Sequence, residues 1–178
     1  MRLIHKNQKG FTLIEVLITV MIVAGIGVVT AAAIGELIQS NRTSNHMAAV
    51  RQVQQAAYWV NRDGVQAENI TVSDGNGGFP LTLSWNWTDL MEGGELHTVV
   101  YNLTNCSGGV CQLERNATVG ANSTTTIVGQ YIYDGTAPPR PTECSWNATE
   151  RVLTLNITAK VGLQTESRTY EIKARPSA

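Results

Sequence analysis

The sequence predicts an α+β fold, in which one long N-terminal helix, partly transmembrane, packs on a mainly antiparallel β-sheet. Residues 11–35 form an apolar run whose only ionisable residue is Glu15. After it, apolar residues recur at spacings of three and four, typical of one helix face; they are Met47, Val50, Val53, Ala57 and Val60. From Ala67 onward the hydrophobic pattern has a period of two, which is typical of strands.

The apolar run is long enough to cross a membrane. Residues 11–35 would span about 37 Å as a helix, against a hydrocarbon core of about 30 Å. An ordinary secretory signal peptide would have a shorter apolar core ending at small residues, for which residues 31–33 are a candidate. A plain signal anchor explains the length but leaves Glu15 unexplained. Basic residues precede the run, so we expect residues 1–10 on the cytoplasmic side and the bulk of the chain outside.

These patterns divide the chain into four expected parts. Residues 1–10 form a cytoplasmic leader, and residues 11–35 form a transmembrane or filament-core helix. Residues 36–63 continue that helix as an amphipathic segment, with Gly64 as its expected end. Residues 64–178 form an extracellular β-rich domain.

Strands are expected wherever apolar and polar residues alternate. These segments are residues 70–72, 81–87, 97–103, 110–115, 126–132, 150–158 and 167–174. Turn residues cluster at 73–78 and 92–95, and three prolines make residues 137–141 a loop.

Three cysteines, Cys106, Cys111 and Cys144, leave one unpaired if the other two form a bridge. Cys106 and Cys111 flank the residues Ser-Gly-Gly-Val, which suggests a hairpin turn with one cysteine on each arm. We therefore expect a disulfide between Cys106 and Cys111, with Cys144 as the alternative partner for either.

Composition and motifs argue against an enzyme. The formal net charge of −1 gives no basic field for nucleic acid. The three histidines are scattered, and no G-x-S-x-G, H-E-x-x-H or P-loop motif is present. We therefore expect no catalytic residues, no cofactor and no metal.

The residues GFTLIEVLI, from Gly10 to Ile18, resemble the processing site of type IV pilins and of the pseudopilins of type II secretion. The glycine, the phenylalanine and the glutamate, Gly10, Phe11 and Glu15, stand where that family has them. The resemblance implies that prepilin peptidase cuts between Gly10 and Phe11 and that the new Phe11 amine is methylated. It also implies that Glu15 pairs with the Phe11 amine of a neighbouring subunit.

The same resemblance implies partners and places. The partners would be other pilin or pseudopilin subunits, prepilin peptidase and the inner-membrane assembly platform. Before assembly the chain would be a single-pass inner-membrane protein. Afterwards it would belong to a surface or periplasmic filament.

The order of the later segments resembles minor pilins and J-type minor pseudopilins. That subgroup has an Arg-Asp pair near the helix end, a Tyr-containing strand, a Leu-x-Arg strand and a basic residue closing the last strand. Here these are carried by VRQVQQAAYWVNRDGVQAENI, HTVVYNLT, QLERN and SRTYEIKARP. The alternatives are a major pilin, a pseudopilin proper, a membrane-anchored binding module that does not polymerise, and a secreted enzyme with an unrecognised site.

The residues that follow the asparagines in the sequence are also unusual. Nine of thirteen asparagines stand in N-x-[ST], whereas 29 Ser and Thr among 178 residues predict about two by chance. The nine are Asn41, Asn69, Asn86, Asn102, Asn105, Asn116, Asn122, Asn147 and Asn156. Strand and turn composition raises the numbers of Asn and Thr but, on this interpretation, does not place them two residues apart. Glycosylation explains the spacing, and we expect it at sequons in turns, namely Asn105, Asn116, Asn122 and Asn147.

Overall fold

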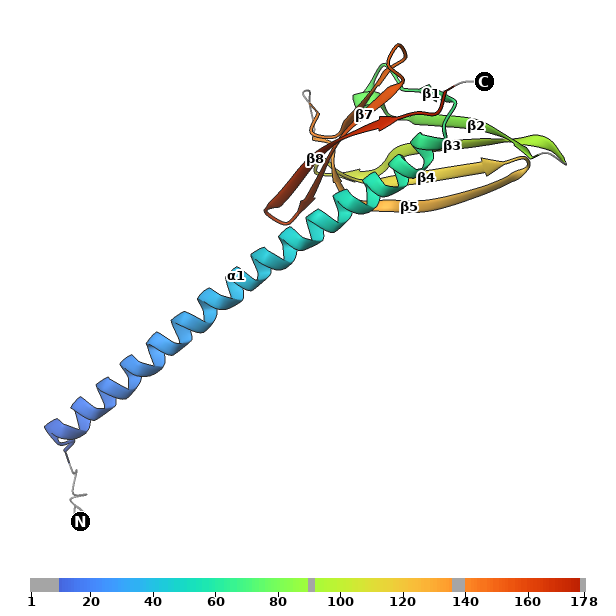
Figure 1. Ribbon diagram of the computed structural model, residues 1–178. Coiled ribbons are helices and arrows are strands. Elements are labelled where there is room, and N and C mark those ends of the chain that lie inside the picture. The colour runs from blue at the N-terminus through green and yellow to red at the C-terminus, as the bar shows by residue number, and fades with distance from the viewer. Residues whose placement is uncertain (1–9, 90–91, 136–139, 177–178) are drawn as a thin grey trace, which may run out of the picture. The chain divides into compact units, whose positions relative to one another are not determined.

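A computed structural model describes residues 10–89, 92–135 and 140–176 (Figure 1). The chain divides into two compact units, Met1–Asn41 and Arg42–Ala178. One continuous helix, α1 (Leu13–Gln66), begins in the first unit and ends in the second. The architecture is an α+β fold with an antiparallel sheet, which confirms the predicted fold class.

In the first unit, every described residue of the helix is exposed, including large apolar side chains such as Leu13 and Val28. This stretch is long and apolar enough to cross a membrane, with a mean hydropathy of 2.5 over its best window. Its two internal threonines bond backward along the helix: the Oγ1 atoms of Thr19 and Thr30 donate to the carbonyls of Glu15 and Ile26, at 2.7 and 2.8 Å. These hydroxyls therefore need no partner from outside the helix, as an apolar environment requires.

In the second unit, α1 buries one stripe against the sheet. The buried residues are Ala49, Val53, Ala56, Ala57, Val60, Asp63 and Gly64. Three of the five predicted apolar-face residues, Val53, Ala57 and Val60, belong to this stripe, whereas Met47 is half exposed. Small residues dominate it, so the helix backbone can approach the sheet closely.

Gly64 does not end the helix, and that prediction was wrong. The helix continues to Gln66, and Gly64 packs against β8 (Gln164–Lys173). A Cβ atom at Gly64 would lie 2.9 Å from Cγ2 of Ile172. The glycine is therefore a point of close approach between helix and strand and has no role as a stop signal.

Eight strands form one sheet in which all pairings are antiparallel. Their bounds are β1 (Asn69–Thr71), β2 (Leu81–Asp89), β3 (Glu92–Ser107), β4 (Val110–Val119), β5 (Asn122–Tyr133), β6 (Glu143–Asn147), β7 (Val152–Val161) and β8, with a short 3-10 turn η1 (Asn76–Gly78) after β1. The order is β1-β2-β3-β4-β5-β7-β6, with β8 on β7. A single residue pair, Ile132 with Ala159, joins β5 to β7.

Two local predictions differ from the structure. Residues 92–95, expected as a turn, belong to β3, and Glu95 pairs with Trp87 of β2. The hairpin closes more tightly than expected, because only residues 90–91, which lie outside the described residues, separate the two strands. Strand β6 was not predicted. Most of the expected proline loop, residues 137–139, also lies outside the described residues.

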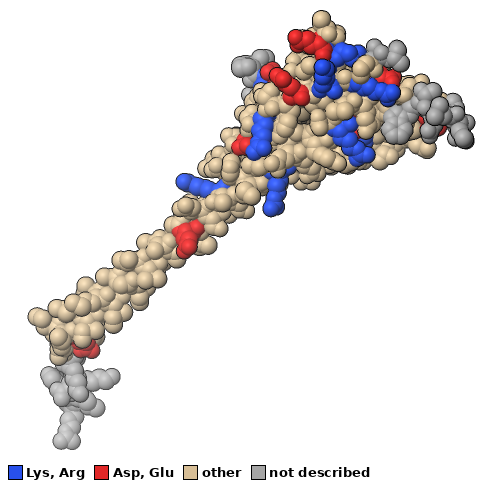
Figure 2. Space-filling model, in the orientation of Figure 1, with Lys and Arg blue, Asp and Glu red and all other residues tan. Residues whose placement is uncertain are grey.

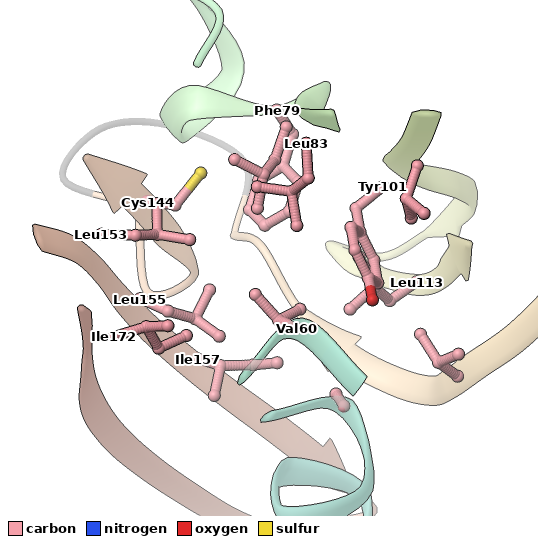
Figure 3. Packing of buried hydrophobic residues seen from close by; sticks show 14 of the residues in the cluster. Val60, Phe79, Leu83, Tyr101, Leu113, Cys144, Leu153, Leu155, Ile157 and Ile172 are labelled. Carbon is pink, nitrogen blue, oxygen red and sulfur yellow. The ribbon is translucent and has the colours of Figure 1, made fainter. Parts of the chain in front are cut away.

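The core of the second unit lies between α1 and the sheet (Figure 3). Val60 of the helix lies between Leu155, Ile157 and Ile172 on one side and Leu83, Tyr101 and Leu113 on the other. All seven residues are essentially inaccessible to solvent. Burial of each large aliphatic side chain contributes about 1.5–3 kcal/mol, so this cluster fixes the position of the helix end.

Candidate functional site

The predicted processing and assembly residues lie at the start of the first unit. Gly10 and Phe11 precede the helix, and 80% of the Phe11 side-chain surface is exposed. The amides of Glu15 and Val16 donate to the Thr12 carbonyl, at 3.1 and 3.3 Å, which starts the helix. The peptide bond after Gly10 therefore lies in an exposed stretch before the helix begins.

Glu15 occupies the first turn of α1. A carboxylate there interacts favourably with the positive end of the helix dipole. The surrounding helix is apolar, and Figure 2 shows its surface as mostly tan with few charged side chains. The residues beside Glu15, from Phe11 to Met21, form an exposed apolar surface. Such a surface would take a second apolar helix, and the carboxylate would then need a cation, because an isolated charge in hydrocarbon is costly.

A second carboxylate, Asp63, lies at the other end of the helix and is satisfied within the chain. The Arg115 guanidinium binds it through two atoms, with Nε 2.6 Å from Oδ2 and a terminal nitrogen 3.1 Å from Oδ1. The Tyr101 hydroxyl donates to the same Oδ2 at 2.5 Å. Asp63 and Tyr101 are buried, and the Arg115 side chain is 15% exposed. These three residues, here called the Asp63 clamp, join the end of α1 to β3 and β4.

The electrostatics of the clamp favour one protonation state. Burial, and then the Asp63 charge, raise the pKa of Tyr101 well above its usual range, so the phenol remains a donor. The hydrogen bond to Asp63 raises the pKa of Arg115, which stays cationic. The guanidinium groups of Arg62 and Arg115 both lie over the Trp59 ring, at 5.2 and 5.1 Å from its centroid. A bidentate pair with a third donor is therefore packed against an aromatic ring and held in one geometry.

The clamp brings together residues from three of the segments on which the resemblance to minor pilins depends. The Arg-Asp pair supplies Arg62 and Asp63, the Tyr-containing strand supplies Tyr101, and the Leu-x-Arg strand supplies Arg115. Sequence spacing could not have predicted this contact, because Asp63 and Arg115 are 52 residues apart.

The structure joins Cys106 and Cys111 by a disulfide across the β3–β4 turn. The turn glycines Gly108 and Gly109 both have positive φ, and the Gly109 carbonyl accepts the amide of Asp134 at 2.9 Å. This bridged hairpin is thereby held against the end of β5.

Cys144 is the remaining thiol, and it is buried. Its Sγ donates to the Gly78 carbonyl at 3.3 Å. Burial raises the pKa of the Cys144 thiol to about 12, so the reactive thiolate is not formed near neutral pH.

The four singled-out sequons do not all lie in turns. Asn122 begins β5, and Asn147 ends β6 with its Oδ1 accepting the amides of Thr149 and Glu150. Asn105 lies in β3 beside the β3–β4 turn, in the left-handed region at φ 51°. Asn116, however, lies inside β4 between β3 and β5, is half buried, and accepts a 2.6 Å hydrogen bond from Thr125. The turn prediction for Asn116 was wrong, because its strand continues to Val119.

The spacing of the sequons also has a structural source. Five run along strands with an apolar residue in the middle: Asn69, Asn86, Asn102, Asn116 and Asn156. The middle residues Ile70 and Ile157 are buried. Because successive strand residues point to opposite faces, Asn and Thr two residues apart share the other face. Strand alternation therefore favours polar residues two positions apart, which is the spacing of N-x-T.

Metal-ligating residues do not gather in the part of the chain that the structure describes. No group of three or more His, Cys, Asp or Glu could hold a metal ion there. His97 stacks on the Trp85 ring at 5.5 Å, and His46 is exposed on α1.

Comparison with known proteins yields one match, at the N-terminus. Residues 5–34 match the family model described as the prokaryotic N-terminal methylation motif. Searches of curated proteins and of solved structures found no match. The matched segment contains Gly10, Phe11 and Glu15 and covers the apolar run as far as residue 34. The match supports a chain of the type IV pilin or pseudopilin type, in the segment that carries the processing motif.

Proposed function

We propose that the chain is a minor-pilin-like structural subunit of a type IV pilus or a related secretion pseudopilus. The observation that carries this proposal is Glu15, the one ionisable residue among residues 11–35, at the start of an exposed apolar helix. The match to residues 5–34 supports it. The minor assignment is supported by the Asp63 clamp, whose residues are those that resemble the minor subgroup.

Processing would create the partner that Glu15 lacks. Prepilin peptidase would hydrolyse the bond between Gly10 and Phe11, leaving residues 1–10 as the leader and freeing the Phe11 amine, which would then be methylated. A methylated amine keeps its positive charge. In the assembled bundle the Glu15 carboxylate of one subunit would pair with the Phe11 ammonium of its neighbour. One unpaired buried charge costs about 3–5 kcal/mol, so pairing selects the correct axial register of the helices.

The proposal assigns a place to each part of the chain. Residues 11–35 would span the inner membrane before assembly and lie in the filament core afterwards. The amphipathic part of the helix, predicted as residues 36–63 and extending to Gln66 in the structure, carries the β-rich domain. That domain, residues 64–178, would lie outside the membrane before assembly and on the filament surface after it. The partners would be other pilin or pseudopilin subunits, the peptidase and the inner-membrane assembly platform.

The N-terminus of the mature protein tests the proposal. Filaments sheared from native cells would be purified, and the first peptide of this chain sequenced by mass spectrometry. We expect it to begin at Phe11 with one added methyl group. A chain that keeps Met1 in the mature, exported form would contradict processing and would favour a membrane-anchored binding module.

A further inference from the structure

In the second unit the fold covers one side of α1 and leaves the opposite side open. Arg51 and Val60 are nine residues apart, or about two and a half helical turns, so they lie on opposite sides of the helix. Val60 is fully buried against the sheet, whereas Arg51 is exposed. Figure 1 shows this part of α1 in front of the sheet, with no strand on its outer side.

The open side carries a row of residues that stand alternately four and three positions apart, which is the heptad spacing. This row, here called the outer stripe, consists of Met47, Arg51, Gln54, Tyr58, Asn61 and Val65, with Arg62 beside it. Its large apolar side chains are open to solvent, because Met47, Tyr58 and Val65 are 49%, 61% and 49% exposed. Side chains in such a row lie along one line of the helix, and two helices pack together through rows of this kind.

The outer stripe has the composition of a protein interface. Methionine, tyrosine and arginine are enriched at interfaces, and tyrosine and arginine are among the residues that most often dominate the binding energy. The Tyr58 ring packs edge-on against the Trp59 ring, with the ring centres 5.9 Å apart, and the Arg62 guanidinium lies over the same ring. Both side chains are therefore held in place within the chain, which lowers the entropic cost of binding a partner.

The charges on the open side of the helix have one sign. Between residues 42 and 66 the helix has three arginines, Arg42, Arg51 and Arg62, and its one carboxylate, Asp63, is buried in the clamp. Neither Arg51 nor Arg62 forms an ion pair with a described residue. In the groove between α1 and β8 that borders the stripe, Glu171 is the one carboxylate among the described lining residues. The outer stripe therefore presents two cations without ion pairs on an apolar and aromatic surface.

We propose that the outer stripe packs against an acidic helix of a different pilin-type subunit. The occupant is a helix, because the stripe is one side chain wide and runs from Met47 to Val65, about 27 Å along α1. It is acidic, because Arg51 and Arg62 leave the stripe without a balancing charge. If the same stripe of a second copy lay against it, arginine would face arginine, and like charges repel. A non-identical neighbour also agrees with the minor role proposed above.

The spacing of the two arginines specifies the partner further. Arg51 and Arg62 are eleven residues apart, or about 17 Å along the helix axis. Two carboxylates that face them on a partner helix need nearly the same separation, which is about ten to twelve residues. Apolar side chains between these carboxylates would cover Tyr58. The inference rests on the proposed filament function and names the kind of neighbour that this chain has in the filament.

Site-specific photo-cross-linking in the full-length chain tests the contact while leaving both arginines and Tyr58 in place. The photoreactive residue p-benzoylphenylalanine would replace exposed Gln55, which lies one turn after Arg51 on the same side of the helix. In the matched control it would replace Thr124, which is exposed on β5. After irradiation of native cells, the cross-linked peptide would be sequenced by mass spectrometry.

We expect the cross-linked peptide to come from the helix of a non-identical pilin-type protein, with two Asp or Glu residues about eleven positions apart. A peptide from a second copy of this chain, or from a segment without such a carboxylate pair, would overturn the inference. Finding the expected peptide in the filament fraction supports both the contact and the filament role. Finding it in membranes of cells whose filaments lack the chain supports the contact and overturns the filament role. Filaments that contain the Gln55 variant but yield no more cross-link than the Thr124 control overturn the contact and leave the filament role standing.

Charge reversal gives a second measurement. Arg51→Glu and Arg62→Glu should each lower incorporation into filaments about ten-fold, whereas Lys173→Glu, at an exposed cation of β8, should change it less than about two-fold. Arg51→Lys keeps the charge and should retain most of the incorporation. Lysine in place of the partner carboxylate that faces Arg51 should restore incorporation of the Arg51→Glu chain. Equal effects of Arg51→Glu and Lys173→Glu, or no rescue by the partner substitution, would count against the contact.

Discussion

The two halves of α1 belong to one continuous helix but meet different surroundings. From Leu13 to Asn41 every side chain is exposed, and the residues are mostly large and apolar. From Arg42 to Gln66 the helix buries a stripe of small residues against its own sheet. The first half therefore needs a covering from outside the chain, whether lipid or other helices. The fold itself covers the buried stripe of the second half.

The two carboxylates Glu15 and Asp63 show the same contrast. Asp63 accepts three hydrogen bonds from Tyr101 and Arg115 and completes its ion pair within the chain. Glu15 makes no ion pair among the residues that the structure describes. A charge that the fold satisfies serves stability, and one that the fold leaves open is available for assembly. The predictions below test this division, from the largest expected effect to the smallest.

Glu15→Ala should abolish assembly without unfolding the β domain. The substitution would leave the neighbour's Phe11 ammonium buried without a partner, at a cost of about 3–5 kcal/mol, or at least a hundred-fold in incorporation. Filament content by quantitative immunoblotting and denaturant unfolding of the detergent-solubilised chain would measure the two effects. Glu36→Ala, at the other exposed glutamate of the helix, is the matched control and should assemble normally. Normal incorporation of Glu15→Ala would sink the charge-pair mechanism.

Asp63→Ala should instead lower the stability of the β domain. It would leave the partly buried Arg115 cation unpaired, and we expect the free energy of unfolding to fall by about 3–5 kcal/mol. Chemical denaturation followed by tryptophan fluorescence would report it. Combining Asp63→Leu with Arg115→Leu removes both charges and should recover much of the loss. A double variant as unstable as Asp63→Ala would show that charge pairing is not the reason for the effect.

Glycine substitutions distinguish the two halves of the helix by packing. Gly64→Ala gains about 1 kcal/mol in helix propensity. It also forces a methyl group to within 2.9 Å of Ile172, and such overpacking costs about 1–3 kcal/mol. We therefore expect a net loss of about 1 kcal/mol in unfolding experiments. Gly35→Ala meets nothing within 4 Å and should be neutral or stabilising. If the two variants behave alike, Gly64 is not a contact with β8.

The cysteines should differ in accessibility. Non-reducing peptide mapping should find Cys106 linked to Cys111. Cys144, a buried thiol with a pKa raised to about 12, should resist alkylation at pH 8 until the protein is unfolded. Recovery of a peptide linking Cys144 to Cys106 or Cys111 would refute this connectivity.

Sequence patterns predicted the parts of the fold that depend on local periodicity. The apolar run and the strands with regular alternation, such as β2 and β7, were visible because one buried face leaves a repeat in the sequence. Strand β6 was missed because five residues are too few to show a clear repeat, and the strand is defined by its pairing with β7. Gly64 was misjudged because a glycine at a helix end and one at a close contact look alike without the contact.

The candidate sites were predictable to different degrees for the same reason. Gly10, Phe11 and Glu15 lie within a contiguous motif, so a short stretch identifies them. The Asp63 clamp joins three elements, and neither spacing nor periodicity relates Asp63 to Tyr101 or Arg115. Only the resemblance to a subgroup named their segments together, and the structure shows that Asp63 and Arg115 are in contact.

Sugar attachment, if this host has a transferase, should follow the position of each sequon in the sheet. Asn122 and Asn147 lie at strand ends and are exposed, as is Asn105 beside the β3–β4 turn. Asn116 lies between two neighbouring strands, and its amide already binds Glu114 and Thr125. We therefore expect glycopeptides at Asn105, Asn122 and Asn147 and none at Asn116, because a transferase needs an exposed, extended acceptor segment.

Intact mass of the native protein, followed by glycopeptide mapping, measures this directly. Asn122→Gln and Asn147→Gln should each remove one glycan and change stability by no more than about 0.5 kcal/mol, as expected for surface sites. Asn116→Gln should leave the mass of the glycans unchanged. A mass equal to residues 11–178 with one methyl group and one disulfide would show that strand alternation alone accounts for the sequons. Sugar on Asn116 would show that modification precedes folding of β4, before its strand partners cover it.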